Sequence, residues 1–261
     1  MADIMHLVSF HPPHVQVCTN MHIHLRTQTL KLMPFFNAVF VYFAFVQDPH
    51  GELWTTVLKC LPIVMLILYV VVKGFAFTPA YNYSQRILLG LICSCAGDAL
   101  LNINLFLEGM GAFAIGHIWY ISAFGWKPLR LPIGVALYIC GALAISLAFT
   151  RLDGVLAIGV PIYTALLTTT CWRALARALQ NSSFLNNFCA VGTVLFLLSD
   201  SVIGIHMFLT PVPYSRIIIM STYYTAQFAI AFSTANDSPG PWKHMGNSEP
   251  THKGQRVKTK D

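Results

Sequence analysis

Two aspartates stand deep inside apolar stretches of this sequence, Asp98 at the end of the segment SCAGD and Asp200 at the end of the segment FLLSD. The other eight of the ten acidic residues fall in tails, in loops or near the ends of apolar stretches. An ionised carboxylate in a membrane interior costs roughly 2.5–3.5 kcal/mol on insertion scales, which favours a functional role. Two carboxyl groups that face each other in a poorly hydrated site do not both ionise easily, so they can serve as a general acid and a general base. The competing interpretation is that each aspartate only hydrogen-bonds a neighbouring helix.

A histidine and a tyrosine share one helical face in the stretch 106–125. His117 and Tyr120 fall on the same face as Gly109, Phe113 and Gly116. The glycines allow a neighbouring helix to approach closely. A lone histidine is more often a satisfied core residue than a ligand, but two buried acids elsewhere favour a role for His117 in the site.

Other polar residues stand within three further apolar stretches. Tyr223 and Tyr224 are followed one turn later by Gln227, and Tyr163 is similarly placed within 154–172. Tyrosines at the membrane interface are the usual alternative, which is weaker for positions midway along a span. Lys59 could extend toward the membrane surface, pair with an aspartate or hold a phosphate, and the sequence leaves these three open.

A metal site is the main chemical alternative, since Asp98, His117 and Asp200 offer carboxylate and imidazole ligands of the kind that zinc hydrolases use. No His-x3-His or Glu-x2-His pair occurs within any apolar stretch. We therefore expect acid–base chemistry without a metal or another cofactor.

Membrane helices must position these residues. Of 261 residues 56% are hydrophobic and only 10% are charged, whereas soluble domains carry about a quarter charged residues. The apolar residues come in long blocks, each about one bilayer crossing long, which favours helices over a barrel. We predict an all-α polytopic membrane bundle of about eight transmembrane helices, over 32–47, 54–72, 84–101, 106–125, 131–149, 154–172, 186–205 and 214–233. The block 131–149 has no Asp, Glu, Lys, Arg or His and is predicted to face lipid.

The basic residues predict the orientation. Most of the 16 Lys and Arg residues fall on one side of the predicted spans, which places both termini in the cytosol. The net charge of +6 then records topology, and no nucleic-acid partner is expected. We predict a cytosolic amino-terminal tail over 1–31, a catalytic membrane domain over 32–233 and a basic, disordered cytosolic tail over 234–261.

An internal repeat is visible around the two aspartates. Residues 98–106 (DALLNINLF) resemble residues 200–208 (DSVIGIHMF), with identical residues at both ends and at the sixth position, Ile103 and Ile205. Both segments begin in odd-numbered spans, which would fit two four-helix halves related by an axis along the membrane normal. Chance similarity between leucine-rich helices is the alternative.

Taken in order, these motifs resemble the YhhN-type lysoplasmalogenase family of eight-span membrane proteins. The matching segments are Lys59-x-Leu-Pro62, Ser94-x-x-Gly97-Asp98-x-Leu-Leu101, Phe106-x-x-Gly109-x3-Phe113-x-x-Gly116-His117-x-x-Tyr120, Leu195-Phe196-x-x-Ser199-Asp200 and Tyr223-Tyr224-x-Ala226-Gln227. Cys60 departs from the Lys-Pro pair that is common in the family.

The resemblance implies a hydrolase that cleaves the vinyl ether bond of a lysoplasmalogen to a fatty aldehyde and glycerophosphoethanolamine or glycerophosphocholine. Asp98 and Asp200 would be the catalytic pair. The residues expected to position substrate and water are Lys59, His117, Tyr120, Tyr163, Tyr223, Tyr224 and Gln227. The expected partners are a one-chain lysophospholipid and membrane lipid, with a homodimer left open, in the endoplasmic reticulum membrane.

Two other functional classes fit the same residues. A proton-coupled transporter of a small or amphiphilic solute would also keep buried acids and a four-plus-four repeat. A non-catalytic lipid-binding or scaffolding protein is the third interpretation.

Overall fold

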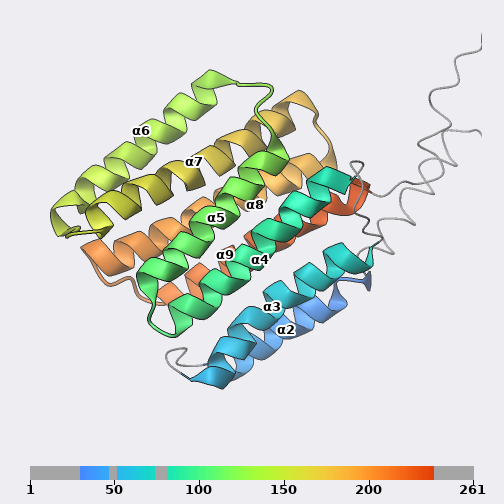
Figure 1. Ribbon diagram of the computed structural model, residues 1–261, viewed down its shortest axis with the longest axis horizontal. Helices are drawn as coiled ribbons and strands as arrows, with labels where there is room; N and C mark the ends of the chain where they lie inside the picture. The colour runs from blue at the N-terminus through green and yellow to red at the C-terminus, as the bar shows by residue number, and fades with distance from the viewer. Residues whose placement is uncertain (1–29, 47–51, 74–80, 238–261) are drawn as a thin grey trace, which may run out of the picture.

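The computed structural model describes residues 30–46, 52–73 and 81–237, and within these ranges the chain is all-helical, with no strand (Figure 1). The α-helices are α2 (Met33–Phe45), α3 (Leu53–Val72), α4 (Asn82–Asn102), α5 (Phe106–Phe124), α6 (Leu131–Ala148), α7 (Leu156–Gln180), α8 (Phe184–Gly204) and α9 (Ser215–Phe232). Short helical turns follow three of them: η2 (Phe149–Arg151), η3 (Ile205–Leu209) and η4 (Ser233–Asp237). Each predicted apolar block therefore corresponds to one helix. The predicted tails lie largely outside the described residues.

Four of these helical segments are long and apolar enough to cross a membrane. They are Leu53–Val72, Asn82–Asn102, Leu131–Arg151 and Phe184–Leu209, with mean hydropathies of 2.3, 1.3, 2.1 and 2.0. Large hydrophobic side chains such as Leu143 (60% exposed) and Val191 (56% exposed) cover the outside of these segments, as lipid contact requires. The chain is therefore an integral membrane protein.

α7 is longer than the apolar block that predicted it. The block ends at residue 172, but the helix continues to Gln180. Arg173 explains the extension, because its guanidinium donates hydrogen bonds to the carbonyl oxygens of Gly125 (2.6 Å) and Pro128 (2.7 Å) in the loop before α6. Arg177, one turn later, lies over the ring of Tyr83 at 4.2 Å. Polar residues thus extend α7 past its apolar block.

α4 and α5 pack closely because glycines make room for aromatic rings. A Cβ atom at Gly97 would lie 2.5 Å from the Phe113 ring, and one at Gly90 would overlap the ring of Tyr120. In turn, a Cβ at Gly116 would lie 3.2 Å from the carbonyl oxygen of Gly90. This contact brings the polar face of α5 directly against the helix that carries Asp98.

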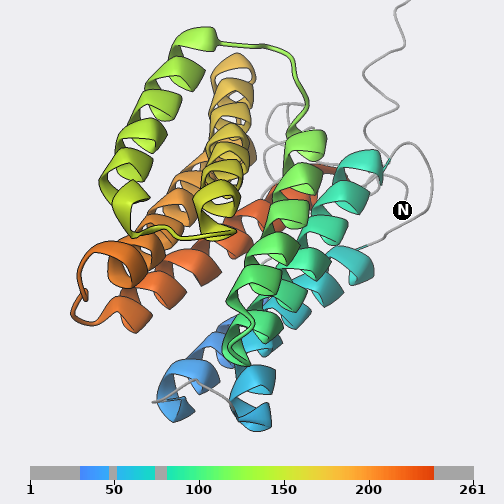
Figure 2. The same cartoon turned by 60° about the vertical axis from the view of Figure 1, so that its left-hand side comes forward.

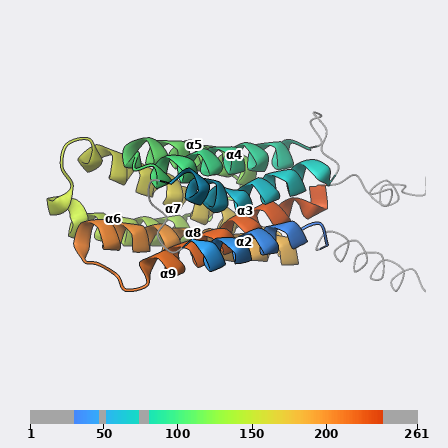
Figure 3. The same ribbon diagram turned by 90° about the horizontal axis from the view of Figure 1, so that it is seen from below.

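The first four helices pack in the same pattern as the last four. The close pairs α2–α3, α3–α4 and α4–α5 correspond to α6–α7, α7–α8 and α8–α9. The cross-contacts α5–α7 and α3–α9 correspond as well. The helix axes are roughly aligned with one another. The start of α2 lies at the same end of the bundle as the end of α9 (Figure 3).

Candidate active site

A cavity of about 370 Å³ lies within the bundle, with walls from α3 to α9 and η3. Most of its lining is apolar. Its ionisable side chains are Lys59, Asp98, Tyr163, Asp200 and Tyr223, together with the thiol of Cys140. The two aspartates that are far apart in sequence therefore face one space.

Asp98 is held by two partners from different helices. The Tyr223 hydroxyl of α9 donates a 2.6 Å hydrogen bond to Asp98 Oδ2, and the Lys59 ammonium of α3 lies 3.7 Å from Oδ1. The Asp98 side chain is only 3% exposed. Of the three roles open for Lys59 in the sequence, the structure gives the pairing with an aspartate. This is the one Asp or Glu ion pair within the described ranges.

Asn102, a residue that sequence analysis missed, fixes the register between α3 and α4. Its side-chain amide donates to the hydroxyls of Thr55 (3.1 Å) and Thr56 (2.7 Å). Thr55 stands one turn before Lys59 and Asn102 one turn after Asp98, so on antiparallel helices this contact aligns the lysine with the aspartate. An asparagine one turn from a buried acid was the available signal.

Asp200 has different neighbours. The Tyr163 hydroxyl of α7 donates to Asp200 Oδ2, and the same hydroxyl lies 3.5 Å from Nε2 of His117 on α5. Nδ1 of His117 lies 3.1 Å from the hydroxyl of Thr170. Asp200 is half-buried and forms no ion pair with a described residue. Thr170 was also missed, although it stands on the Tyr163 face of α7, two turns further on.

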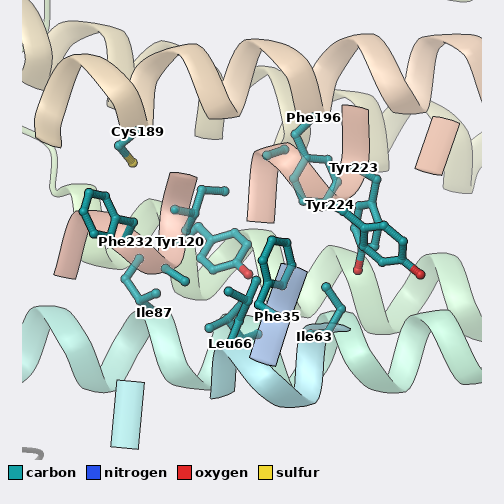
Figure 4. Close-up of a cluster of buried hydrophobic side chains, with 14 of the residues drawn as sticks. Phe35, Ile63, Leu66, Ile87, Tyr120, Cys189, Phe196, Tyr223, Tyr224 and Phe232 are labelled. Atoms are coloured by element: carbon teal, nitrogen blue, oxygen red, sulfur yellow. The ribbon is translucent and has the colours of Figure 1, made fainter. Parts of the chain in front are cut away.

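The remaining predicted site residues lie outside the cavity wall. Tyr224 donates a 2.8 Å hydrogen bond to the backbone carbonyl oxygen of Lys59 and so fixes the position of that backbone. Tyr120 donates to Gln227 Oε1 at 2.8 Å, and this buried pair connects α5 to α9. Tyr223 and Tyr224 lie side by side in Figure 4, but only Tyr223 contributes to the cavity.

A cluster of aromatic rings lies between the partner of Asp98, Tyr223, and the histidine near Asp200, His117. Phe113, Phe196 and Tyr223 make mutual edge-to-face contacts, with ring centroids 5.5–6.4 Å apart. The His117 ring packs on Phe196 at 4.9 Å. Such contacts fix ring orientation, so they hold the Tyr223 hydroxyl and His117 in place.

The residues considered as metal ligands do not form a cluster. In the part of the chain that the structure describes, no three His, Cys, Asp or Glu side chains gather as a metal site would require. His117 instead contacts Tyr163 and Thr170, and reaches Asp200 only through the tyrosine.

The chain is similar to known proteins over most of its length. Lysoplasmalogenase TMEM86A of Homo sapiens is 37% identical over 227 residues, which cover 84% of this chain and 94% of the relative. Its Bos taurus counterpart is 38% identical over 216 residues, with 80% and 90% covered. Lysoplasmalogenase TMEM86B of Homo sapiens is 33% identical over 214 residues, with 80% and 88% covered.

No solved structure matches the chain. The model of the YhhN family matches residues 54–234, from the start of α3 to the turn after α9, and this range contains every residue of the cavity. The chain therefore belongs to the YhhN family.

Proposed function

We propose that this protein is a lysoplasmalogenase, which hydrolyses the vinyl ether bond of a lysoplasmalogen to a fatty aldehyde and glycerophosphoethanolamine or glycerophosphocholine. The names of its relatives support this activity. The observation that carries the proposal is that Asp98 and Asp200 line one largely apolar cavity together with Lys59. Such a cavity suits a lipid with one chain and one charged head group.

The proposed reaction needs a proton donor and a proton acceptor. A vinyl ether has no acyl carbon for a nucleophile, but protonation of its β-carbon gives an oxocarbenium ion. A second carboxylate then takes a proton from water as the water oxygen bonds to that cation. The resulting hemiacetal collapses to aldehyde and alcohol as the ionised general acid takes the hemiacetal hydroxyl proton and the protonated general base gives its proton to the leaving alcohol oxygen, which restores both carboxyl groups. Glycosidases use two carboxyl groups on a similar cation.

The different partners of the two aspartates support opposite roles. An ammonium group and a hydroxyl donor beside Asp98 stabilise its ionised form, which makes Asp98 the general base. Asp200 has a hydroxyl partner and no ammonium partner among the described residues, which makes it the general acid.

The neighbours of Asp200 can accommodate its proton. When Asp200 is protonated, its O–H can donate to the Tyr163 oxygen, and the Tyr163 hydroxyl can donate to Nε2 of His117. Nδ1–H of His117 then donates to Thr170, whose hydroxyl lies 2.9 Å from the carbonyl oxygen of Leu166. Every group in this chain has a matching partner, so His117 and Tyr163 are positioning residues for Asp200.

The positioning roles extend to the other predicted residues. Lys59 lines the cavity and has three donors, so it can contact the substrate phosphate as well as Asp98. Tyr224 holds the backbone of Lys59, while Tyr120 and Gln227 hold α5 against α9. Tyr223, which donates a hydrogen bond to Asp98, can also orient water toward that aspartate.

We also propose eight membrane crossings, both termini in the cytosol, residence in the endoplasmic reticulum membrane and a four-plus-four repeat. The matching order of helix contacts in the two halves supports the repeat. So does the contact between Phe106 and Phe208, the last residues of the two repeated segments, whose rings lie 6.3 Å apart. The predicted bounds of the tails, 1–31 and 234–261, stay part of this proposal.

Aldehyde release by the purified protein tests the activity. We expect a lysoplasmalogen to yield fatty aldehyde, and the matched 1-alkyl lipid without the double bond to yield none. Asp98→Asn and Asp200→Asn should each lower the rate of release by roughly 10²–10⁴, while Asp153→Asn, at an exposed loop position, serves as the control. Uptake into proteoliposomes without conversion would instead identify a transporter. Binding without conversion or uptake would identify a lipid-binding protein.

A further inference from the structure

The cavity opens sideways between α6 and α8. Cys140 and Ala144 of α6 line the cavity and yet are exposed on the outside of the bundle. On the opposite side, Ser201 of α8 and Ile205 of η3 do the same. A residue that lines a cavity and is also exposed marks its mouth.

The other walls of the cavity are closed. The residues that α5 contributes, Phe106, Met110 and Phe113, are buried or half-buried. α6 packs along α7 and touches η3, but α6 and α8 do not pack closely on each other. A Cβ atom placed on Gly204 would meet no atom within 4 Å, which is direct evidence of open space on the α8 side.

This mouth faces lipid. α6 and α8 both belong to the segments that are apolar enough to cross a membrane. Only Gly134 and Ala148 of α6 are buried, so most of the helix surface is exposed, and Figure 2 shows α6 at the edge of the bundle. The prediction that 131–149 faces lipid thus describes one side of α6, while its other side lines the cavity.

The cavity extends along α6 far enough to hold a hydrocarbon chain. Cavity-lining residues on α6 run from Leu137 to Ala148, which is about 16 Å along the helix axis at 1.5 Å per residue. Three of the residues that border the mouth, Cys140, Ala144 and Ser201, have small side chains. Asp200 directly precedes Ser201, so the mouth leads to a carboxyl group of the site.

We propose that this mouth, bordered by Cys140, Ala144, Ser201 and Ile205, is the portal through which the single hydrocarbon chain of a lysophospholipid enters from the bilayer. The proposal rests on the proposed function. It explains how a lipid chain reaches buried carboxyl groups without crossing an aqueous head-group opening. It also makes α6 and α8 the helices that select among chains.

A bulky residue in the mouth tests the portal. Ala144→Trp should lower kcat/KM at least tenfold for a substrate with a 16-carbon chain, and less for one with a short chain. Ala142→Trp is the matched control, because Ala142 is exposed on the same helix and does not line the cavity. Folding is checked by size-exclusion chromatography in detergent. Equal kcat/KM for both tryptophan variants and the wild type would overturn the portal.

A second measurement does not depend on catalysis. A lysophosphatidylethanolamine with a diazirine in its chain should crosslink to peptides of α6 and α8 on irradiation, and Ala144→Trp should remove these crosslinks. Crosslinks confined to other helices would overturn the portal. A wild type that crosslinks at α6 and α8 but releases no aldehyde would instead contradict the proposed function and leave the portal standing.

Discussion

Asp98 and Asp200 begin the two similar segments 98–106 and 200–208 and line the same cavity, but different helices surround them. Asp98 is almost fully buried between a tyrosine and a lysine. Asp200 is half-buried and contacts a tyrosine that is in turn connected to a histidine. In a low-dielectric interior, one ammonium group is enough to distinguish two otherwise equal carboxyl groups. In the proposed mechanism, this difference in neighbours is what makes one aspartate the acid and the other the base.

The largest effect is expected from removing either carboxyl group. Asp98→Asn and Asp200→Asn keep the shape of the side chain but lose the proton-transfer group, which costs roughly 10²–10⁴ in rate. The double variant should be little worse than either single variant, because the residues act as one unit. Initial rates of aldehyde release measure this. If the fold-loss in rate of the double variant equals the product of the two single losses, the two aspartates do not act as one unit.

The second-largest effect is expected from removing the positive charge of Lys59. Lys59→Met should lower kcat roughly 10–100-fold because the ionised form of Asp98 loses its ammonium partner, and Lys59→Arg should restore part of the rate. The matched control is Lys127→Met, in the loop between α5 and α6. If Lys59→Met keeps the wild-type rate, the lysine does not set the difference between the two aspartates.

The tyrosine partners, Tyr163 of Asp200 and Tyr223 of Asp98, test the same difference between the two aspartates. Tyr163→Phe should lower kcat about tenfold, since it disconnects Asp200 from His117. Tyr223→Phe should cost less, because Lys59 still pairs with Asp98. Both variants are read by kcat at saturating substrate. The reverse order would mean that Asp98 depends mainly on its hydroxyl partner.

The smallest effect is expected furthest from the carboxyl groups. Thr170→Val removes the hydroxyl at His117 Nδ1 and should lower kcat about threefold, while Thr170→Ser should retain the wild-type rate. The pH–rate profile should change in the valine variant alone. Equal losses in the serine and valine variants would assign Thr170 to packing rather than to hydrogen bonding.

Much of the fold follows from the sequence, because lipid requires long apolar helices and each block has one. The position of Asp98 and Asp200 at one cavity also agrees with their depth in the blocks. The length of α7 could not be read in the same way, since Arg173 extends it through contacts with a distant loop.

The partners within the site were harder to predict. Lys59 had three plausible roles, and the choice depends on the register that Asn102 sets between α3 and α4. The sequence does not indicate a role for Thr170, because a threonine in an apolar helix usually hydrogen-bonds its own backbone, as Thr170 also does. The two sides of α6 have nearly the same composition, so no periodicity marks the one that lines the cavity.

The protonation states of the two aspartates test the central claim most directly. Infrared difference spectroscopy of the purified protein at neutral pH should show the carbonyl stretch of one buried, protonated carboxyl group. That band should vanish in Asp200→Asn and persist in Asp98→Asn. A band that vanishes in Asp98→Asn and persists in Asp200→Asn would reverse the proposed acid and base and contradict the role assigned to Lys59.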